Sequence, residues 1–260
     1  MKIIEKEIKN STAKIEVLVP VNRIDHVKEE VVDEMIKNIT VKGFRQGKAP
    51  KNIAQNNLDP EKLNNHIISH ILNEAVTETL KEKTYKTLGR PVLEKLETSK
   101  EGEILLIMNF PLYPEFKLGK YKEEIKKAKI KDKKIENVYE ILLKNIKIDI
   151  SPLLVEEEVN HALVRLEEQA KSLNITLEKY FESIKKTKEE VQMDYEKSAL
   201  ESIKLDLILL AIAKEEDLKI SAEEIQSLSQ LANAKSNQLD QIKSILLRRK
   251  TIDFLKDLTA

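Results

Sequence analysis

Two histidines stand at a spacing that could bind a metal ion. His66 and His70 are four residues apart in a stretch with helical periodicity, which places both imidazoles on one face of a helix. Ile67 follows His66, so the pattern His-Glu-x-x-His is not matched, and no third ligand is evident. We therefore interpret the pair as ordinary surface histidines and expect neither a metal nor a cofactor.

Carboxylate and thiol chemistry are not favoured either. Glu156, Glu157 and Glu158 fall in the first turns of an expected helix, where negative charge is stabilised by the helix dipole. The chain has no cysteine, which excludes disulfides, thiolate nucleophiles and Cys-ligated zinc. No catalytic residue is predicted.

The most unusual segment is the loop Lys42-Gly43-Phe44-Arg45-Gln46-Gly47-Lys48-Ala49-Pro50. Between Glu34 and Asp59 the chain has five basic residues and no acidic one, and this gives a local positive field. The two glycines permit a tight exposed turn. Phe44 and Arg45 at its tip suit docking, because they combine an aromatic anchor with a planar guanidinium that binds phosphate or carboxylate.

A competing interpretation treats this loop as a polar turn with Phe44 folded back on the core, and composition does not choose between the two. The loop is not a nucleotide-binding motif. It lacks the pattern G-x-x-x-x-G-K-[ST], and its glycine spacing does not fit G-x-G-x-x-G.

Composition bounds the class of protein. With 45 basic and 45 acidic residues among 260, the formal net charge is zero, which argues against a protein that coats nucleic acid or membrane over its whole surface. The first seven residues carry charges where a signal peptide needs an apolar stretch, and the longest apolar run, residues 207–213, is far short of the ~20 residues that span a bilayer. We expect a cytoplasmic protein without membrane contact.

Glycine and proline divide the chain into two parts. All five glycines and six of the seven prolines lie at or before residue 119. Because these residues punctuate turns, we predict an α+β domain over residues 1–113 and an all-α domain with helical arms over residues 134–260. Residues 114–133 are predicted to be a lysine-rich, solvated linker.

The strands of the first part are indicated by alternation and turn residues. A half-buried strand is predicted where apolar residues alternate with polar ones, and Asn10-Ser11-Thr12 before it predicts a hairpin turn. Two further strands are expected over residues 92–97 and 103–110. The alternating residues are Ile15, Val17 and Val19.

Helix boundaries are indicated by capping residues. Asn22 is expected to cap a first helix, and Asp59-Pro60 to begin a second that continues to Gly89-Arg90-Pro91. In the second part, a helix is expected over residues 134–148, and Thr187 with Glu190 and Ser221 with Glu224 match the capping box, so helices should begin at 188 and 222. Residues 205–213 are apolar nearly all round, which predicts a buried helix at the centre of the helical part.

The loop resembles the signature Gly-Phe-Arg-x-Gly-x-x-Pro of trigger factor, the bacterial ribosome-associated chaperone, and it occurs at the same place, after the first helix. Weaker matches follow in the family's order: Tyr113-Pro114-Glu115-Phe116, residues 152–159, residues 177–180 and residues 248–255. Two departures stand out. Gln46 occupies a position where the family commonly has lysine, and only 36 residues separate Pro114 from Ser151, below the ~50 of an ordinary domain. The family's inserted peptidyl-prolyl isomerase domain is therefore expected to be missing, and no enzymatic activity is expected.

The resemblance implies an ATP-independent chaperone that docks at the ribosomal exit tunnel and shields nascent polypeptides in a helical cradle. The implied partners are a ribosomal protein, with ribosomal RNA as a possible addition, and unfolded nascent chains; pairing of two copies off the ribosome is left open. The implied ribosome-binding residues are Gly43, Phe44, Arg45, Gln46, Gly47, Lys48 and Pro50. The candidate substrate-binding residues are Leu154, Val155, Val159, Leu163, Tyr180, Phe181 and Tyr195.

Other hypotheses are compatible with the same residues. The chain could be a non-chaperone ribosome-associated adaptor or a helical partner-binding protein, and for any single cradle candidate packing between helices is the favoured alternative. The sequence also leaves open whether Gln46 weakens docking and whether the helix at 134–148 packs with the linker or with the helical body.

Overall fold

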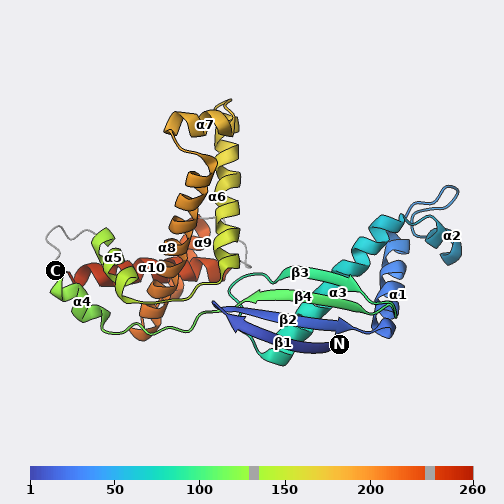
Figure 1. The fold of residues 1–260 in the computed structure, drawn as a ribbon, viewed down its shortest axis with the longest axis horizontal. Coiled ribbons are helices and arrows are strands. Elements are labelled where there is room, and N and C mark those ends of the chain that lie inside the picture. The colour runs from blue at the N-terminus through green and yellow to red at the C-terminus, as the bar shows by residue number, and fades with distance from the viewer. Residues whose placement is uncertain (129–134, 232–237, 260) are drawn as a thin grey trace. The chain divides into compact units, whose positions relative to one another are not determined.

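The computed structural model describes residues 1–128, 135–231 and 238–259, and the chain divides into two compact units between Tyr113 and Pro114. Within the described residues, every named strand belongs to the first unit, which also contains three helices, and the second unit is helical (Figure 1). The predicted class, an α+β part followed by an all-α part, is confirmed.

The first unit is built on an antiparallel sheet with the strand order β1-β2-β4-β3. Its strands are β1 (Lys2–Lys9), β2 (Thr12–Val19), β3 (Val92–Thr98) and β4 (Ile104–Pro111). Asn10 and Ser11 join β1 to β2 with positive φ angles of 47° and 50°, the conformation of a two-residue hairpin turn that follows the twist of the strands. The predicted hairpin is therefore confirmed.

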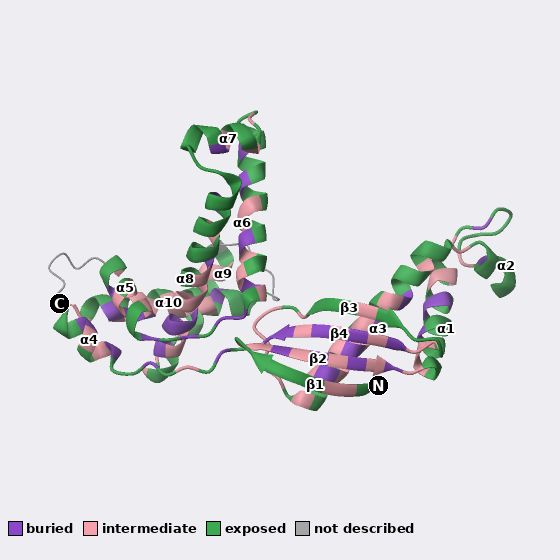
Figure 2. Cartoon of the chain, in the orientation of Figure 1, coloured by how far each residue is buried: buried purple, intermediate pink, exposed green. Residues whose placement is uncertain are grey.

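The core of the first unit lies between one face of this sheet and two helices, α1 (Val21–Asn38) and α3 (Pro60–Lys83). Alternate residues of β2 are fully buried, and their partners on β4 are buried with them, as the banding of both strands in Figure 2 shows. This is the period of two that places every second side chain on the core face. The core residues of β2 are Ala13, Ile15, Val17 and Val19.

Helix α1 begins two residues earlier than its sequence indicates. Asn22 was expected to be the cap, but the helix starts at Val21 and Pro20 is the capping residue, with no side-chain cap bond. Pro20 is extended, at φ −74° and ψ 155°, and its carbonyl accepts hydrogen bonds from the N–H groups of Arg23 and Ile24. The fixed φ of proline thus defines the start of the helix.

Helix α3 begins as predicted and ends earlier than predicted. The Asp59 carboxylate accepts hydrogen bonds from the N–H groups of Glu61 and Lys62, and Pro60 occupies the first turn. The expected end at Gly89-Arg90-Pro91 is wrong, because the helix stops at Lys83 and Thr84 adopts the left-handed conformation, with φ 53°. The left-handed residue that follows a helix is usually glycine, and for that reason the sequence indicated an end at Gly89 instead of at Thr84.

The second unit contains seven helices in its described residues: α4 (Tyr121–Lys127), α5 (Ile135–Asn145), α6 (Pro152–Ser172), α7 (Leu177–Ile184), α8 (Lys188–Glu215), α9 (Ala222–Leu231) and α10 (Leu239–Asp257). Both predicted capping boxes are present. Thr187 and Glu190 exchange hydrogen bonds of 2.8 and 3.2 Å at the start of α8, and Ser221 and Glu224 do so at 2.7 and 3.2 Å before α9.

Helix α8 is the central element of this unit and packs against α5, α6 and α10. Its apolar run is buried, as predicted, at Leu207, Ile208, Leu209, Ile212 and Ala213. On α10, the buried Thr251 hydroxyl donates to the Leu209 carbonyl at 3.2 Å and lies 2.8 Å from the Leu247 carbonyl of its own helix. Away from this body, α6 and the N-terminal part of α8 run side by side with α7 at their tip; these three segments are called the arm below (Figure 1).

The segment expected to be a solvated linker is partly packed. Tyr121 and Ile125 on α4 are 3% and 1% exposed. The Tyr121 hydroxyl donates to Glu216 at 2.8 Å, and the Lys122 ammonium lies 2.6 Å from the same carboxylate at the end of α8. The expectation of a solvated connector is therefore wrong for α4, and the predicted boundary at residues 133–134 lies outside the described residues.

Helix α5 belongs to the helical body, which answers a question that its sequence left open. It also packs against α4, which lies in the predicted linker, as well as against α8 and α10, so both packing partners that the sequence left open are found. Val138 and Leu142 on this helix are buried.

None of the helices in the described ranges combines the length and apolarity that crossing a membrane requires.

Candidate functional site

The segment from Ile39 to Pro50 forms a hook at the end of α1, and this segment is called the hook below. Two turns shape its tip: the Phe44 N–H donates to the Val41 carbonyl at 3.0 Å, and the Lys48 N–H donates to the Arg45 carbonyl at 2.9 Å. The Gly47 N–H donates to the Ile39 carbonyl at 3.1 Å, which closes the hook at its base.

Glycine is required at the base of the hook for two separate reasons. Gly47 has a φ of 67°, and a Cβ there would lie 2.4 Å from the carbonyl oxygen of Lys37. Gly43, at the tip, has a φ of 90°, but a Cβ added there would have nothing within 4 Å. The close approach of the hook's returning strand of chain to the end of α1 therefore depends on Gly47, whereas Gly43 only permits the turn.

Phe44 and Arg45 are exposed at the tip. The Phe44 side chain is 40% exposed, and Arg45 is exposed beside it. The alternative interpretation, with Phe44 folded back on the core, is wrong. An aromatic ring held in solvent on a hydrogen-bonded turn is a feature of contact surfaces rather than of packing.

A short helix that the sequence did not predict follows the hook. Helix α2 (Lys51–Asn56) begins after Pro50, and its Ala54 is fully buried. On its outer side Ile53 is 37% exposed, which adds a second apolar side chain to this end of the unit. Six residues with a single buried position give no readable periodicity, so only the proline start could have indicated it.

Of the five basic residues of this region, Lys37 lies in the last turn of α1, and the other four have different surroundings. The Lys51 ammonium lies 2.6 Å from the Asp33 carboxylate of α1, and this hydrogen bond raises the pKa of Lys51 above its usual value. Lys42, Arg45 and Lys48 have no acidic partner among the described residues, so their charge is directed to solvent. The local positive field at the tip therefore comes from these three side chains.

The histidines do not form a metal site in the described residues. The His70 Nε2 lies 3.7 Å from the Glu34 carboxylate on α1, and His66 is exposed. No group of three or more His, Asp or Glu side chains within the described ranges is arranged to hold a metal ion.

The seven candidate substrate-binding residues divide into two groups. Leu154, Val159 and Phe181 are buried, at 9%, 4% and 9% exposure, so in this structure they pack between helices and the assignment of these three to a client surface is not supported. Phe181 packs with Leu166 of α6 and Val191 of α8, which fixes α7 to the rest of the arm. The other four are half-buried: Val155, Leu163, Tyr180 and Tyr195.

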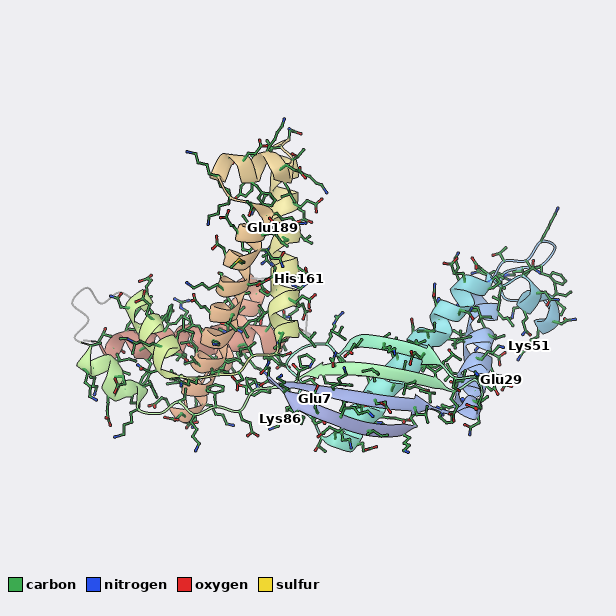
Figure 3. The ribbon with its side chains drawn as sticks, in the orientation of Figure 1. Glu7, Glu29, Lys51, Lys86, His161 and Glu189 are labelled. Atoms are coloured by element: carbon green, nitrogen blue, oxygen red, sulfur yellow. The ribbon has the colours of Figure 1, made fainter. Side chains whose placement is uncertain are left out.

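More exposed apolar side chains lie elsewhere on the arm, and the sequence interpretation missed them. Val164, Leu173, Ile184 and Met193 are 53%, 69%, 39% and 67% exposed. Figure 3 labels His161 on α6 and Glu189 on α8, so exposed polar side chains lie on the same helices. These residues fall outside the buried helical stripe, and that position is the signal that could have identified them.

Comparison with known proteins places these features in a family. The family model described as bacterial trigger factor protein matches residues 1–142, and the one described as its C-terminus matches residues 116–257. Each covers more than half of the chain. The two matched regions overlap, so no isomerase domain is inserted between them, and that expectation is confirmed.

Curated relatives and a solved structure agree with the family models. The trigger factor of Carboxydothermus hydrogenoformans is 32% identical over 151 residues, covering 54% of this chain and 34% of that protein. The trigger factor of Clostridium tetani is 37% identical over 116 residues, covering 42% and 27%. The chain thus matches about a third or less of the length of these relatives.

One solved structure is described as "Promiscuous Substrate Recognition in Folding and Assembly Activities of the Trigger Factor Chaperone". Its alignment with this chain covers 100% of both chains, with a TM-score of 0.66 and 14% sequence identity, and so supports the fold. Two family models over most of the chain, with the signature loop exposed at the end of α1, show that the chain belongs to the bacterial trigger factor family.

Proposed function

We propose that the chain is an ATP-independent molecular chaperone that docks at the ribosomal exit tunnel through residues 43–50 and shields nascent polypeptides with its helical unit. The observation that carries the proposal is the exposed Phe44–Arg45 pair on a hydrogen-bonded turn. Family membership supports it. Its place of action would be the cytoplasm, where nascent chains leave the ribosome.

The chemistry of docking follows from the tip. Phe44 supplies apolar area for a pocket on the ribosome, and the Arg45 guanidinium pairs with a carboxylate or phosphate in a planar, bidentate geometry. Lys42 and Lys48 contribute a positive field that steers the chain towards the anionic ribosome surface.

Docking then makes weak contacts with clients effective. A short tether gives an effective concentration of ~mM, so exposed apolar side chains on the arm meet an emerging chain without high intrinsic affinity. Burial of apolar area contributes only ~25 cal/mol per Å², so scattered side chains such as Leu173 and Met193 release a client once its own core forms. This cycle needs no nucleotide, and the sequence contains no glycine pattern typical of a nucleotide site.

The test is co-sedimentation with ribosomes of the chain carrying both Phe44→Ala and Arg45→Ala. We expect loss of binding, because both anchors are removed. A matched control is Arg90→Ala with Val92→Ala, which removes one exposed cation and one exposed apolar side chain elsewhere in the first unit. Undiminished binding of the Phe44 and Arg45 variant would refute the docking role.

A second assay separates the chaperone from its alternatives. The purified chain should delay aggregation of an unfolded client at stoichiometric concentration without ATP. If it fails to do so while ribosome binding is intact, the chain acts as a ribosome-associated adaptor. Turnover of a proline tetrapeptide above background would contradict the absence of isomerase activity.

A further inference from the structure

The returning limb of the hook is tied to the C-terminal end of α1. The Gln46 amide Nε2 donates to the Asn38 carbonyl at 3.0 Å, and the Gly47 N–H donates to the Ile39 carbonyl at 3.1 Å. The last carbonyls of a helix have no partner within the helix, so these two donors satisfy acceptors that would otherwise turn to water. Gln46 therefore points back to the helix rather than outward.

A second tie lies at the start of α2. The Lys51 ammonium pairs with the Asp33 carboxylate of α1 at 2.6 Å, although both side chains are more than half exposed. Glu29, about one turn earlier on α1, also contributes a favourable charge to Lys51; Figure 3 labels both residues at this end of the unit. Lys51 lies four residues after Gly47, just beyond the end of the hook. Its pairing with Asp33 therefore ties the segment that follows the hook back to α1.

We propose that Gln46 and Lys51 are positioning residues that hold the hook in its docking shape, and that the charge which meets the ribosome comes from Lys42, Arg45 and Lys48. This inference rests on the proposed docking function and specifies how the docking loop is built. In this structure the Gln46 amide donates to the end of α1, so the lack of charge at position 46 removes none of the contacts that hold the hook.

If Lys51 positions the hook, one substitution should change the affinity for ribosomes in the opposite direction from the change expected if Lys51 contacts an anionic partner directly. Asp33→Asn removes a negative charge close to the hook. If Lys51 contacts the ribosome directly, that change frees its ammonium and strengthens binding. If Lys51 positions the hook, the same change breaks the tie and weakens binding.

Gln46→Ala provides an independent test because it changes no charge. Direct electrostatic contact predicts no effect, whereas loss of the hydrogen bond to Asn38 loosens the hook. The fraction of molecules with a competent hook then falls, and the apparent dissociation constant rises in proportion. The slope of affinity against salt concentration should be unchanged, since no cation has been removed, whereas Arg45→Ala should reduce that slope.

In the experiment, the fluorescently labelled 260-residue chain is titrated with purified ribosomes at two salt concentrations. We expect Asp33→Asn and Gln46→Ala each to weaken binding about two- to fivefold, the range for a single exposed ion pair or hydrogen bond. The matched controls are Asp25→Asn on α1 and Gln55→Ala on α2, exposed residues without an ion pair or side-chain hydrogen bond among the described residues. Both controls should bind as the wild type does.

Tighter or unchanged binding of Asp33→Asn, or unchanged binding of Gln46→Ala, would overturn the positioning role. Amide hydrogen exchange at Gly47 in the free chain gives a readout without ribosomes: Gln46→Ala should accelerate it, and equal protection in wild type and variant would overturn the inference. If the double variant at Phe44 and Arg45 binds normally, the docking function fails instead, and the exchange measurement still decides whether Gln46 holds the hook.

Discussion

Substitution of Gly47 by alanine tests whether the shape of the hook, and not only its tip residues, determines docking. A Cβ at this position would lie 2.4 Å from the Lys37 carbonyl oxygen and 3.1 Å from its carbon, inside the 3.4 Å at which ordinary contact begins. Both neighbours are backbone atoms that no side-chain rotation can move. The two limbs of the hook must therefore separate.

The magnitude follows from two contributions. Alanine in the left-handed region costs about 1–2 kcal/mol relative to glycine. Separation of the limbs also breaks the bonds from Gly47 to Ile39 and from Gln46 to Asn38, each contributing about 0.5–1.5 kcal/mol. The closed hook is thus disfavoured by about 2–5 kcal/mol in Gly47→Ala.

Gly43→Ala is the matched control. It also requires a positive φ, of 90°, but nothing lies within 4 Å of its Cβ position, so only the cost of the backbone conformation applies, about 1–2 kcal/mol. The two lost hydrogen bonds separate the variants by about 1–3 kcal/mol. At about 1.4 kcal/mol per tenfold change in affinity, Gly47→Ala should weaken ribosome binding about fivefold or more relative to Gly43→Ala.

The assay is a ribosome-binding titration together with amide exchange at residue 47 of the free chain. Rapid exchange is expected in Gly47→Ala and retained protection in Gly43→Ala. Equal losses of affinity in the two variants, with residue 47 still protected in both, would refute the argument from the hook's shape.

Three further substitutions test the helical unit. Thr251→Val removes the hydroxyl that reaches the Leu209 carbonyl, and should lower the free energy of unfolding by about 0.5–1.5 kcal/mol in a urea titration. Phe181→Ala removes the packing that holds α7 to α6 and α8, and should accelerate amide exchange throughout α7 while α10 keeps its protection. Glu216→Gln removes a carboxylate whose pKa is lowered chiefly by its hydrogen bond to Lys122. The wild type should therefore have a higher free energy of unfolding than the variant at pH 7. This difference should disappear as the pH falls below 4.5, the ordinary pKa of a glutamate, because the carboxylate is then protonated. A constant stability difference across this pH range would contradict the role of the ion pair.

Features set by local chemistry could be predicted from the sequence. The Asp59-Pro60 start of α3, both capping boxes, the hairpin at Asn10 and the alternation of β2 all appear in the structure. Each depends on residues within a few positions of one another, and so their signal is contained in a short window.

Features decided by tertiary contact could not be predicted in the same way. Tyr121 and Ile125 lie in a lysine-rich run, and only their burial against the helical body reveals that α4 is not a solvated connector. Likewise Phe181 and Val159 have the apolar character that a client surface needs, but the same character suits packing between helices. The glycines and basic residues of the hook were identifiable in the sequence, whereas the pairing of Lys51 on α2 with Asp33 on α1 is seen only in the folded chain.

The most direct measurement of the central claim is the affinity of the chain for ribosomes that carry an unfolded nascent polypeptide, compared with empty ribosomes. Simultaneous use of hook and arm predicts tighter binding to the occupied ribosomes, and loss of binding to both kinds when Phe44 and Arg45 are replaced by alanine. Equal affinity for both kinds of ribosome, or wild-type affinity in the double variant, would contradict it.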